Sequence, residues 1–240
     1  MSDANTGSTP RISRRELRRR AEQLAATPVL TPEAAPAPGA ATGALATILT
    51  VCTGNICRSP MAEVLLRHRL EGLPIRVHSG GTQALVGYEM PEQAVQLAVA
   101  QGVAPGDAAQ HRARYLAESM LEESDLVLTM AREHRTHAVQ LSPASLRRAF
   151  TLREFARLGA GMTDAQVHAV ADAAGADPGE RLRALAGAVG ERRGLTPPVA
   201  GEDDDVIDPY RRSQRTYELS ASQLVPAVET VARLVRATIG

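Results

Sequence analysis

Short apolar runs alternate with segments of helical spacing along most of this chain. The apolar runs cover residues 48–51, 125–130 and, more weakly, 149–152, and residues 75–79 form a further short strand. Between them, apolar residues recur every three or four positions, which predicts helices, for example over 91–101 and 131–141. Strands that alternate with helices form parallel sheets joined by right-handed crossovers. The pattern therefore predicts an α/β fold around a parallel sheet.

The first 45 residues lack this alternation, and we expect them to form a flexible extension rich in Pro and Ala. Ser13 and Glu16 fit a capping box that would start a short helix ending near Ala26. The expected helix carries a basic cluster of Arg11, Arg14, Arg15, Arg18, Arg19 and Arg20. This basic arm either contacts an acidic partner or anionic surface, or is a solvated tail without a specific role. The folded domain is predicted over 46–240.

The C-terminal segment from Arg212 is predicted to be a pair of helices that Pro226 breaks or kinks. Apolar residues follow helical spacing there at Leu224, Val228, Val231, Leu234 and Val235. We expect this stripe to pack against the sheet.

Composition limits the classes of function. Basic and acidic residues number 27 each, so no net charge suggests a nucleic-acid partner, and 2% aromatic residues argue against stacking platforms for single strands. The chain has 2 cysteines, and both lie in one loop, so neither a disulfide scaffold nor a zinc site is expected. No apolar run has the length of a transmembrane span or resembles a signal peptide, which favours a cytoplasmic location.

The loop between the first strand and the next helix contains the candidate chemistry. A loop of this length that opens a helix can turn its backbone N–H groups inward and bind a tetrahedral oxyanion. Gly54 and Asn55 tolerate the left-handed backbone that such a loop needs, and Arg58 can grip two phosphate oxygens. Cys52 ends the strand, where amides, helix dipole and arginine favour its nucleophilic thiolate. Alone, Cys52 would be an ordinary buried cysteine; the combination predicts a phosphate site.

The stretch over 51–60 reads Val-Cys-Thr-Gly-Asn-Ile-Cys-Arg-Ser-Pro. It resembles the signature of the low-molecular-weight protein tyrosine phosphatases, Val-Cys-x-Gly-Asn-x-Cys-Arg-Ser-Pro, at every fixed position. Residues 79–82 also look like the Ser-Ala-Gly-Thr of that family, and 125–130, followed by Glu133 and His134, look like its third-strand segment. The resemblance implies a three-layer sandwich. Its four-stranded parallel sheet would have helices on both faces, with the phosphate-binding loop after the first strand.

A phosphate ester also needs a proton donor for its leaving oxygen. The family carries this acid in an Asp-Pro-Tyr or Asp-Pro-Phe motif near the C-terminus, and residues 208–210 read Asp-Pro-Tyr. The resemblance therefore implies Asp208 as general acid and Tyr210 as a pocket wall. We expect the acidic run over 203–205 to be a solvated loop, with Asp205 as the alternative donor.

The resemblance implies a bacterial protein-tyrosine phosphatase that works through a phosphocysteine intermediate, without metal or cofactor. The expected catalytic residues are Cys52, Arg58 and Asp208. The expected phosphate- and substrate-binding residues are Thr53, Gly54, Asn55, Ile56, Cys57, Arg58, Ser59 and Tyr210. Asn55 would hold the loop, and Ser59 would hydrogen-bond the sulfur of Cys52. The implied partner is a phosphotyrosine protein, with a bacterial tyrosine kinase as a candidate.

Cys57 has two interpretations. In the family, the second cysteine of the loop can form a reversible disulfide with the nucleophile, which protects it from overoxidation. Alternatively, Cys57 is simply a small buried residue.

Segment 159–201 is longer than the corresponding connection in the family. Thr163 with Gln166, and Asp177 before Pro178, predict two helices in this insert. The insert is either a lid or partner surface, or a passive elaboration.

Three other functions remain open. An arsenate reductase would need cysteines beyond Cys57 or an external thiol. Protein-arginine phosphatases carry Thr at the position of Ile56, which favours phosphotyrosine here. A phosphate-binding module without catalysis is the third, although Cys52, Arg58 and Asp208 are all present.

Overall fold

The computed structural model describes residues 45–197 and 199–240. The predicted basic arm and its helix to about Ala26 lie outside these residues.

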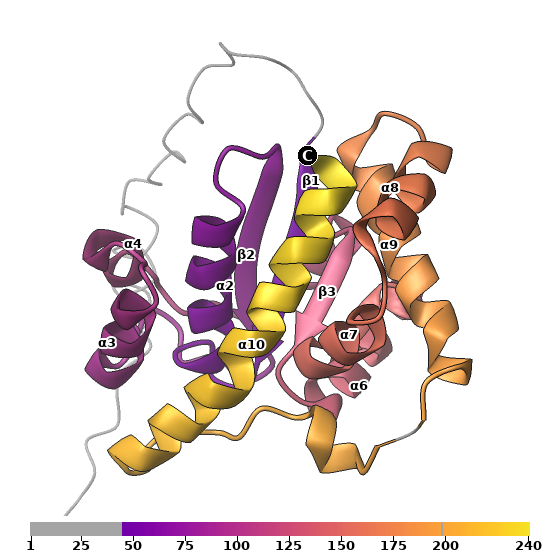
Figure 1. The fold of residues 1–240 in the computed structure, drawn as a ribbon. Helices are drawn as coiled ribbons and strands as arrows, with labels where there is room; N and C mark the ends of the chain where they lie inside the picture. Colours follow the sequence, from indigo (N-terminus) through magenta and orange to yellow (C-terminus); the bar gives the residue numbers. More distant parts are fainter. Residues whose placement is uncertain (1–44, 198) are drawn as a thin grey trace, which may run out of the picture. The chain divides into compact units, whose positions relative to one another are not determined.

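Four strands form one sheet, β1 (Ala46–Cys52), β2 (Ile75–Gly81), β3 (Leu126–Thr129) and β4 (Ala149–Thr151). Their order is β2-β1-β3-β4 and every pairing is parallel. Figure 1 shows β2, β1 and β3 side by side. Cys52 pairs with Gly81, and Val51 pairs with Thr129. The carboxyl ends of these strands therefore meet at one edge, where parallel sheets bind ligands. The predicted α/β fold with four parallel strands is confirmed.

The helices are α2 (Arg58–Arg69), α3 (Glu92–Ala100), α4 (Pro105–Ala109), α5 (Glu118–Glu122), α6 (Arg132–Leu141), α7 (Leu152–Gly159), α8 (Asp164–Ala173), α9 (Pro178–Glu191) and α10 (Gln214–Ile239). Short 3₁₀ turns occur at Pro143–Ser145, Arg192–Gly194 and Gly201–Asp204.

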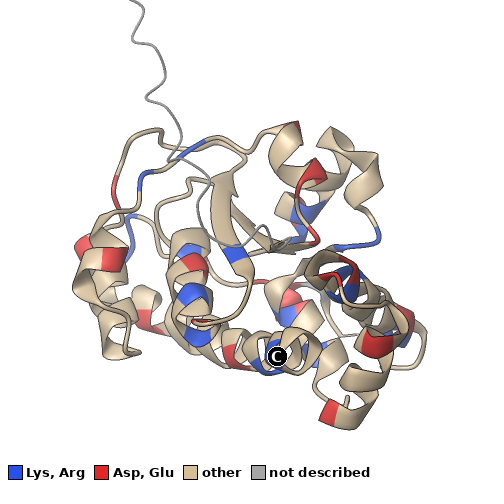
Figure 2. Ribbon diagram, turned by 90° about the horizontal axis from the view of Figure 1, so that it is seen from above, with Lys and Arg blue, Asp and Glu red and all other residues tan. Residues whose placement is uncertain are grey.

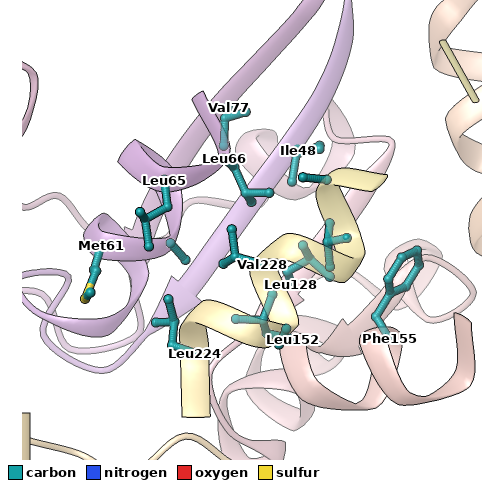
Figure 3. Packing of buried hydrophobic residues seen from close by; sticks show 14 of the residues in the cluster. Ile48, Met61, Leu65, Leu66, Val77, Leu128, Leu152, Phe155, Leu224 and Val228 are labelled. Carbon is teal, nitrogen blue, oxygen red and sulfur yellow. The ribbon is translucent and has the colours of Figure 1, made fainter. Parts of the chain in front are cut away.

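Helices cover both faces of the sheet. Alternate residues of β1 point to opposite sides, so Ile48 packs in one hydrophobic cluster and Leu49 and Val51 in another. Figure 3 shows the first cluster between the sheet and α2, α7 and α10. The second cluster lies under α5 and α6, with Leu121 and Ala138. These two clusters make the three layers that the family resemblance implied.

The two helices of the insert form where their caps predict. Thr163 and Gln166 make a reciprocal capping box at α8, and Asp177 accepts a hydrogen bond from the first turn of α9. The start of α9 is tied to the sheet by an ion pair of 2.6 Å between Arg183 and Asp125. In Figure 1, α8 lies beside the end of the sheet where the strands begin.

The prediction of a C-terminal helix pair is wrong, because α10 continues through Pro226. Proline removes the hydrogen bond to the carbonyl four residues earlier, at Ser222. Both residues are exposed, so water can reach that carbonyl. On the opposite side, Leu224 and Val228 are buried, and α10 runs across the sheet between α2 and α7 (Figure 1). Burial of this stripe keeps the helix continuous.

Basic and acidic residues are interspersed on the described helices, as Figure 2 shows. Several pair across elements, such as Arg69 with Glu229 at 2.8 Å and Arg233 with Asp164 at 2.6 Å. Among the described residues, no helix is both long and apolar enough to cross a membrane.

Candidate active site

The loop over 53–57 connects the carboxyl end of β1 to the first turn of α2. Cys52 is the last residue of the strand and Arg58 is the first residue of the helix. No side chain caps the N-terminus of α2 within the described residues. The positive end of the helix dipole therefore faces the loop, which favours an anion there.

Four successive carbonyl groups, that of Cys52 and those of the first three loop residues, point away from the centre of the loop, because each accepts a hydrogen bond from outside. The donors and acceptors are Thr82 N to Cys52 O (3.0 Å), Gln83 N to Thr53 O (2.9 Å), Leu85 N to Gly54 O (3.0 Å) and His111 Nε2 to Asn55 O (2.7 Å). In the described part of the chain, no backbone N–H group of residues 53–59 donates to a protein acceptor. With their carbonyls turned outward, these amides are available to an oxyanion.

Asn55 holds the shape of the loop. Its φ is +54°, and its fully buried amide nitrogen donates to Ser59 Oγ at 3.0 Å and Ser79 Oγ at 2.8 Å. Its side-chain oxygen accepts from the backbone N–H of Arg114 at 3.0 Å. Gly54 does not have a positive φ, so the expectation of a left-handed backbone holds for Asn55 and is wrong for Gly54.

A glycine on the neighbouring strand permits this close packing. A Cβ atom on Gly81 would lie 2.6 Å from Thr53 O and 2.9 Å from Asn55 Cβ. Any side chain at Gly81 would push the loop away from β2.

The sulfur of Cys52 lies 3.0 Å from Ser59 Oγ, and the residue Cys52 is only 2% exposed to solvent. Because Asn55 Nδ2 donates to Ser59 Oγ, the hydroxyl proton of Ser59 is free to point at the sulfur. A hydrogen bond of this kind stabilises a thiolate.

Arg58 joins the loop to the segment that carries Asp208. Its guanidinium is buried and donates to Val206 O at 3.1 Å and to Thr53 Oγ1 at 3.3 Å. Arg58 Nη2 also lies 2.8 Å from Asp208 Oδ2. The other carboxylate oxygen of Asp208 accepts from the backbone N–H of Tyr210 at 3.2 Å, so the turn orients the acid.

These groups surround a cavity of about 120 Å³. Its lining residues are Cys52, Thr53, Gly54, Ile56, Cys57, Arg58, Gln83, Leu85, Asp208 and Tyr210. The structure thus brings the predicted nucleophile, arginine and acid together. Asn55 and Ser59 support the lining through hydrogen bonds, whereas Gln83 had no motif that could identify it.

The acidic run is not simply a solvated loop, so that prediction is wrong for two of its residues. Asp204 accepts two hydrogen bonds from the guanidinium of Arg157, at 3.0 and 2.7 Å. Asp205 Oδ1 accepts from the backbone N–H of Arg132 at the start of α6, at 2.9 Å. Asp205 therefore faces α6, and the run anchors the loop that leads to Asp208.

Cys57 is buried, and its sulfur lies 3.7 Å from the hydroxyl of Tyr217. Burial raises the pKa of Cys57 to about 12. Cys57 is therefore a protonated thiol at neutral pH, although it also lines the cavity.

Sequence reasoning did not identify His134 as part of the site. Its Nε2 atom lies 2.8 Å from Thr53 Oγ1. Burial, followed by the nearby charge of Arg58, lowers the pKa of His134 to about 3, so the ring is neutral at pH 7. Its sequence signal was the pair Glu133 and His134 after the third strand.

The fold and the loop together are those of an α/β protein that can bind an oxyanion between its first parallel strand and the following helix, with a cysteine at the end of that strand. A family model described as low molecular weight phosphotyrosine protein phosphatase matches residues 47–169. The chain belongs to this family of cysteine-dependent phosphatases, which confirms the predicted family. The matched residues end before the insert does, so Asp208 and Tyr210 lie beyond them.

Two relatives and one solved structure illustrate the similarity. The "Probable low molecular weight protein-tyrosine-phosphatase EpsP" of Ralstonia nicotianae is 41% identical over 108 residues, which cover 45% of this chain and 71% of the relative. The protein-arginine-phosphatase of Bacillus subtilis is 34% identical over 110 residues, covering 45% and 71%. The low molecular weight protein tyrosine phosphatase structure from T. tengcongensis is 27% identical with a TM-score of 0.54, covering 78% and 98%.

Proposed function

We propose that this protein is a protein-tyrosine phosphatase that hydrolyses phosphotyrosine through a phosphocysteine intermediate. The observation that supports it best is that Cys52, Arg58 and Asp208 line one cavity. The loop turns its carbonyls away from this cavity, which leaves its amides available to a phosphate. The family membership supports the same activity.

In the first step, the phosphate of the substrate accepts hydrogen bonds from the amides of residues 53–59 and from Arg58. The thiolate of Cys52 attacks phosphorus in line and forms the S–P bond as the bond to the tyrosine oxygen breaks. Protonated Asp208 gives its proton to the departing oxygen, so tyrosine leaves as a neutral phenol.

In the second step, Asp208 is a carboxylate and takes a proton from a water molecule that attacks phosphorus. The S–P bond breaks, phosphate is released, and Cys52 returns to its thiolate. Ser59 stabilises that leaving thiolate through the contact of 3.0 Å. Fixed amides and Arg58 carry the charge of both transition states in this scheme.

The cavity walls favour an aromatic substrate. Ile56, Leu85 and the ring of Tyr210 are the apolar groups of the lining. A tyrosine ring can pack against these surfaces, and it stacks well on Tyr210.

Arginine phosphatase activity is the second candidate, because one relative of 34% identity is named for it. A phosphoarginine guanidinium needs acceptors that Ile56 lacks. An arsenate reductase would need an external thiol, because the chain has 2 cysteines and both lie in the loop. A silent phosphate-binding module would leave the pairing of Arg58 with Asp208 without a chemical role.

We also propose that residues 46–240 form the phosphatase domain and that 159–201 is an insert within it. The insert brings the chain back to Asp204, whose ion pair with Arg157 anchors the acid loop. The residues 1–45 would be a basic arm for an acidic partner, and a tyrosine kinase in the bacterial cytoplasm is a candidate source of substrate.

The test is steady-state hydrolysis of p-nitrophenyl phosphate, a phosphotyrosine peptide and a phosphoarginine peptide. The wild type should hydrolyse the first two, Cys52→Ser should be inactive, and Ile56→Thr should shift preference towards phosphoarginine. A wild type that binds phosphate without turnover would refute the enzyme and favour the binding module. A wild type that prefers phosphoarginine would favour the second candidate.

A further inference from the structure

His134 is a buried side chain beside the phosphate loop that the proposed reaction does not use. It lies in the first turn of α6 and is 2% exposed. Its ring nitrogen Nε2 is 2.8 Å from Thr53 Oγ1, while Nδ1 is buried with no hydrogen-bond partner in the described part of the chain.

The hydroxyl of Thr53 can accept two hydrogen bonds and donate one. A guanidinium can only donate, so the contact of 3.3 Å from Arg58 Nη2 occupies one lone pair of Thr53 Oγ1. The orientation of the hydroxyl proton then depends on His134.

The surroundings of His134 indicate which nitrogen holds its proton. A buried N–H without an acceptor is rarer in proteins than an acceptor without a donor, which argues against a proton on Nδ1. Nε2 has acceptors near it, Thr53 Oγ1 at 2.8 Å and the carboxylate of Glu133 at 3.4 Å. We therefore assign the proton to Nε2, which donates to Thr53 Oγ1.

We propose that His134 is a positioning residue that directs the hydroxyl proton of Thr53 at the bound phosphate. With both lone pairs of Thr53 Oγ1 occupied by Arg58 and His134, the hydroxyl can engage a ligand only as a donor. Thr53 lines the cavity, so this donor joins the backbone amides of the cradle. The inference rests on the proposed function for its role in turnover, but its effect on phosphate binding does not.

The experiment measures the affinity for inorganic phosphate by calorimetry and kcat and KM for p-nitrophenyl phosphate. Thr53→Val and His134→Leu should each weaken phosphate binding about tenfold, the scale of one hydrogen bond to a charged group. Thr53→Ser keeps the hydroxyl, and His134→Gln keeps an N–H at similar reach, so both should stay within about threefold of wild type. The double variant Thr53→Val with His134→Leu should bind no more weakly than Thr53→Val, since both changes remove the same donor.

His137→Leu is the matched control, because His137 is an exposed histidine on the same helix, and it should bind phosphate as the wild type does. Thermal melting checks that each variant folds. If His134→Leu does not fold, His134→Asn replaces it, since the shorter amide does not reach Thr53 Oγ1.

Unchanged phosphate binding in His134→Leu would overturn the inference. A double variant whose loss of phosphate affinity equals the product of the two single losses would overturn it as well. These outcomes are separate from a failure of the proposed function. A wild type that binds phosphate but does not hydrolyse p-nitrophenyl phosphate would refute the enzyme, and the binding series would still decide the role of His134.

Discussion

Arg58 Nη2 lies 2.8 Å from Asp208 Oδ2, so the proposed phosphate-binding arginine is paired with the proposed general acid. A phosphate that binds Arg58 must share its guanidinium with this carboxylate. The side chain of Asp208 is 49% exposed to solvent, so the net strength of this ion pair is that of a surface ion pair. Substrate can therefore displace the carboxylate at small cost.

This geometry predicts two opposite effects of Asp208→Asn. Turnover of a phosphotyrosine peptide should fall by roughly 10²–10⁴-fold because the proton donor is lost. The fall should be smaller for p-nitrophenyl phosphate, whose leaving group needs less help. Inorganic phosphate, measured as a competitive inhibitor, should bind up to about fivefold more tightly because Arg58 loses its competing anion. An unimpaired Asp208→Asn enzyme would mean that the proton comes from elsewhere.

Asn55→Ala should destabilise the domain and lower activity together. The change leaves the buried hydroxyl groups of Ser59 and Ser79 without their donor and puts alanine at a φ of +54°. We expect a loss of about 2–4 kcal/mol in the free energy of unfolding, measured in urea. Asn55→Gly is the matched variant, because glycine tolerates this φ; it should recover about 1 kcal/mol but not activity.

Asp204→Asn should slow turnover without weakening phosphate binding. It replaces one of the two carboxylate oxygens that accept from Arg157 with an NH2 group, which cannot accept, so the contact that holds the chain before Asp208 is weakened while the cradle of residues 53–59 is untouched. We expect kcat to fall several-fold and stability to fall by about 1–3 kcal/mol. Asp203→Asn, at an exposed neighbouring position, is the control and should resemble the wild type. Equal effects of the two variants would contradict an anchoring role.

Cys57 should resist alkylation under conditions in which Cys52 is alkylated. Its raised pKa of about 12 keeps it protonated, and the thiolate is the reactive form. In Cys52→Ser, iodoacetamide at pH 7.5 should therefore leave the protein unlabelled by mass spectrometry. If Cys57 protects the nucleophile through a disulfide, Cys57→Ser should make peroxide inactivation of Cys52 less reversible by thiols. Equally reversible inactivation would leave Cys57 as a packing residue.

The free energy of unfolding should decrease as the pH is lowered below about 6.5, before most carboxylates titrate. Burial lowers the pKa of His78 to about 4 and that of His134 to about 3, whereas unfolded histidine titrates near 6.5. Between these values the unfolded chain binds protons that the folded protein does not, so acid favours unfolding. Each histidine contributes a slope of up to about 1.4 kcal/mol per pH unit. Urea unfolding between pH 7.5 and 5 measures it, and a slope near zero would contradict their buried neutral state. His78→Asn should reduce the slope.

The strand, loop and helix around Cys52 were predictable because the residues that define them are consecutive. The caps of α8 and α9 were predictable for the same reason, since Thr163 bonds a residue three positions away. The order of strands and helices also implied a parallel sheet, and with it the edge at which Cys52 lies.

Other features depend on contacts between distant segments. Thr53 and His134 are 81 residues apart, and Arg157 and Asp204 are 47 residues apart, so no local pattern relates them. Proline signals a helix break locally, yet burial of the stripe around Leu224 and Val228 keeps α10 intact through Pro226. The fold class and the residues of the loop follow from the order of residues alone, because short-range geometry and periodicity encode them. The side chains that orient and anchor those residues are set by the three-dimensional fold, because hydrogen bonds and ion pairs require groups that folding brings within about 3 Å.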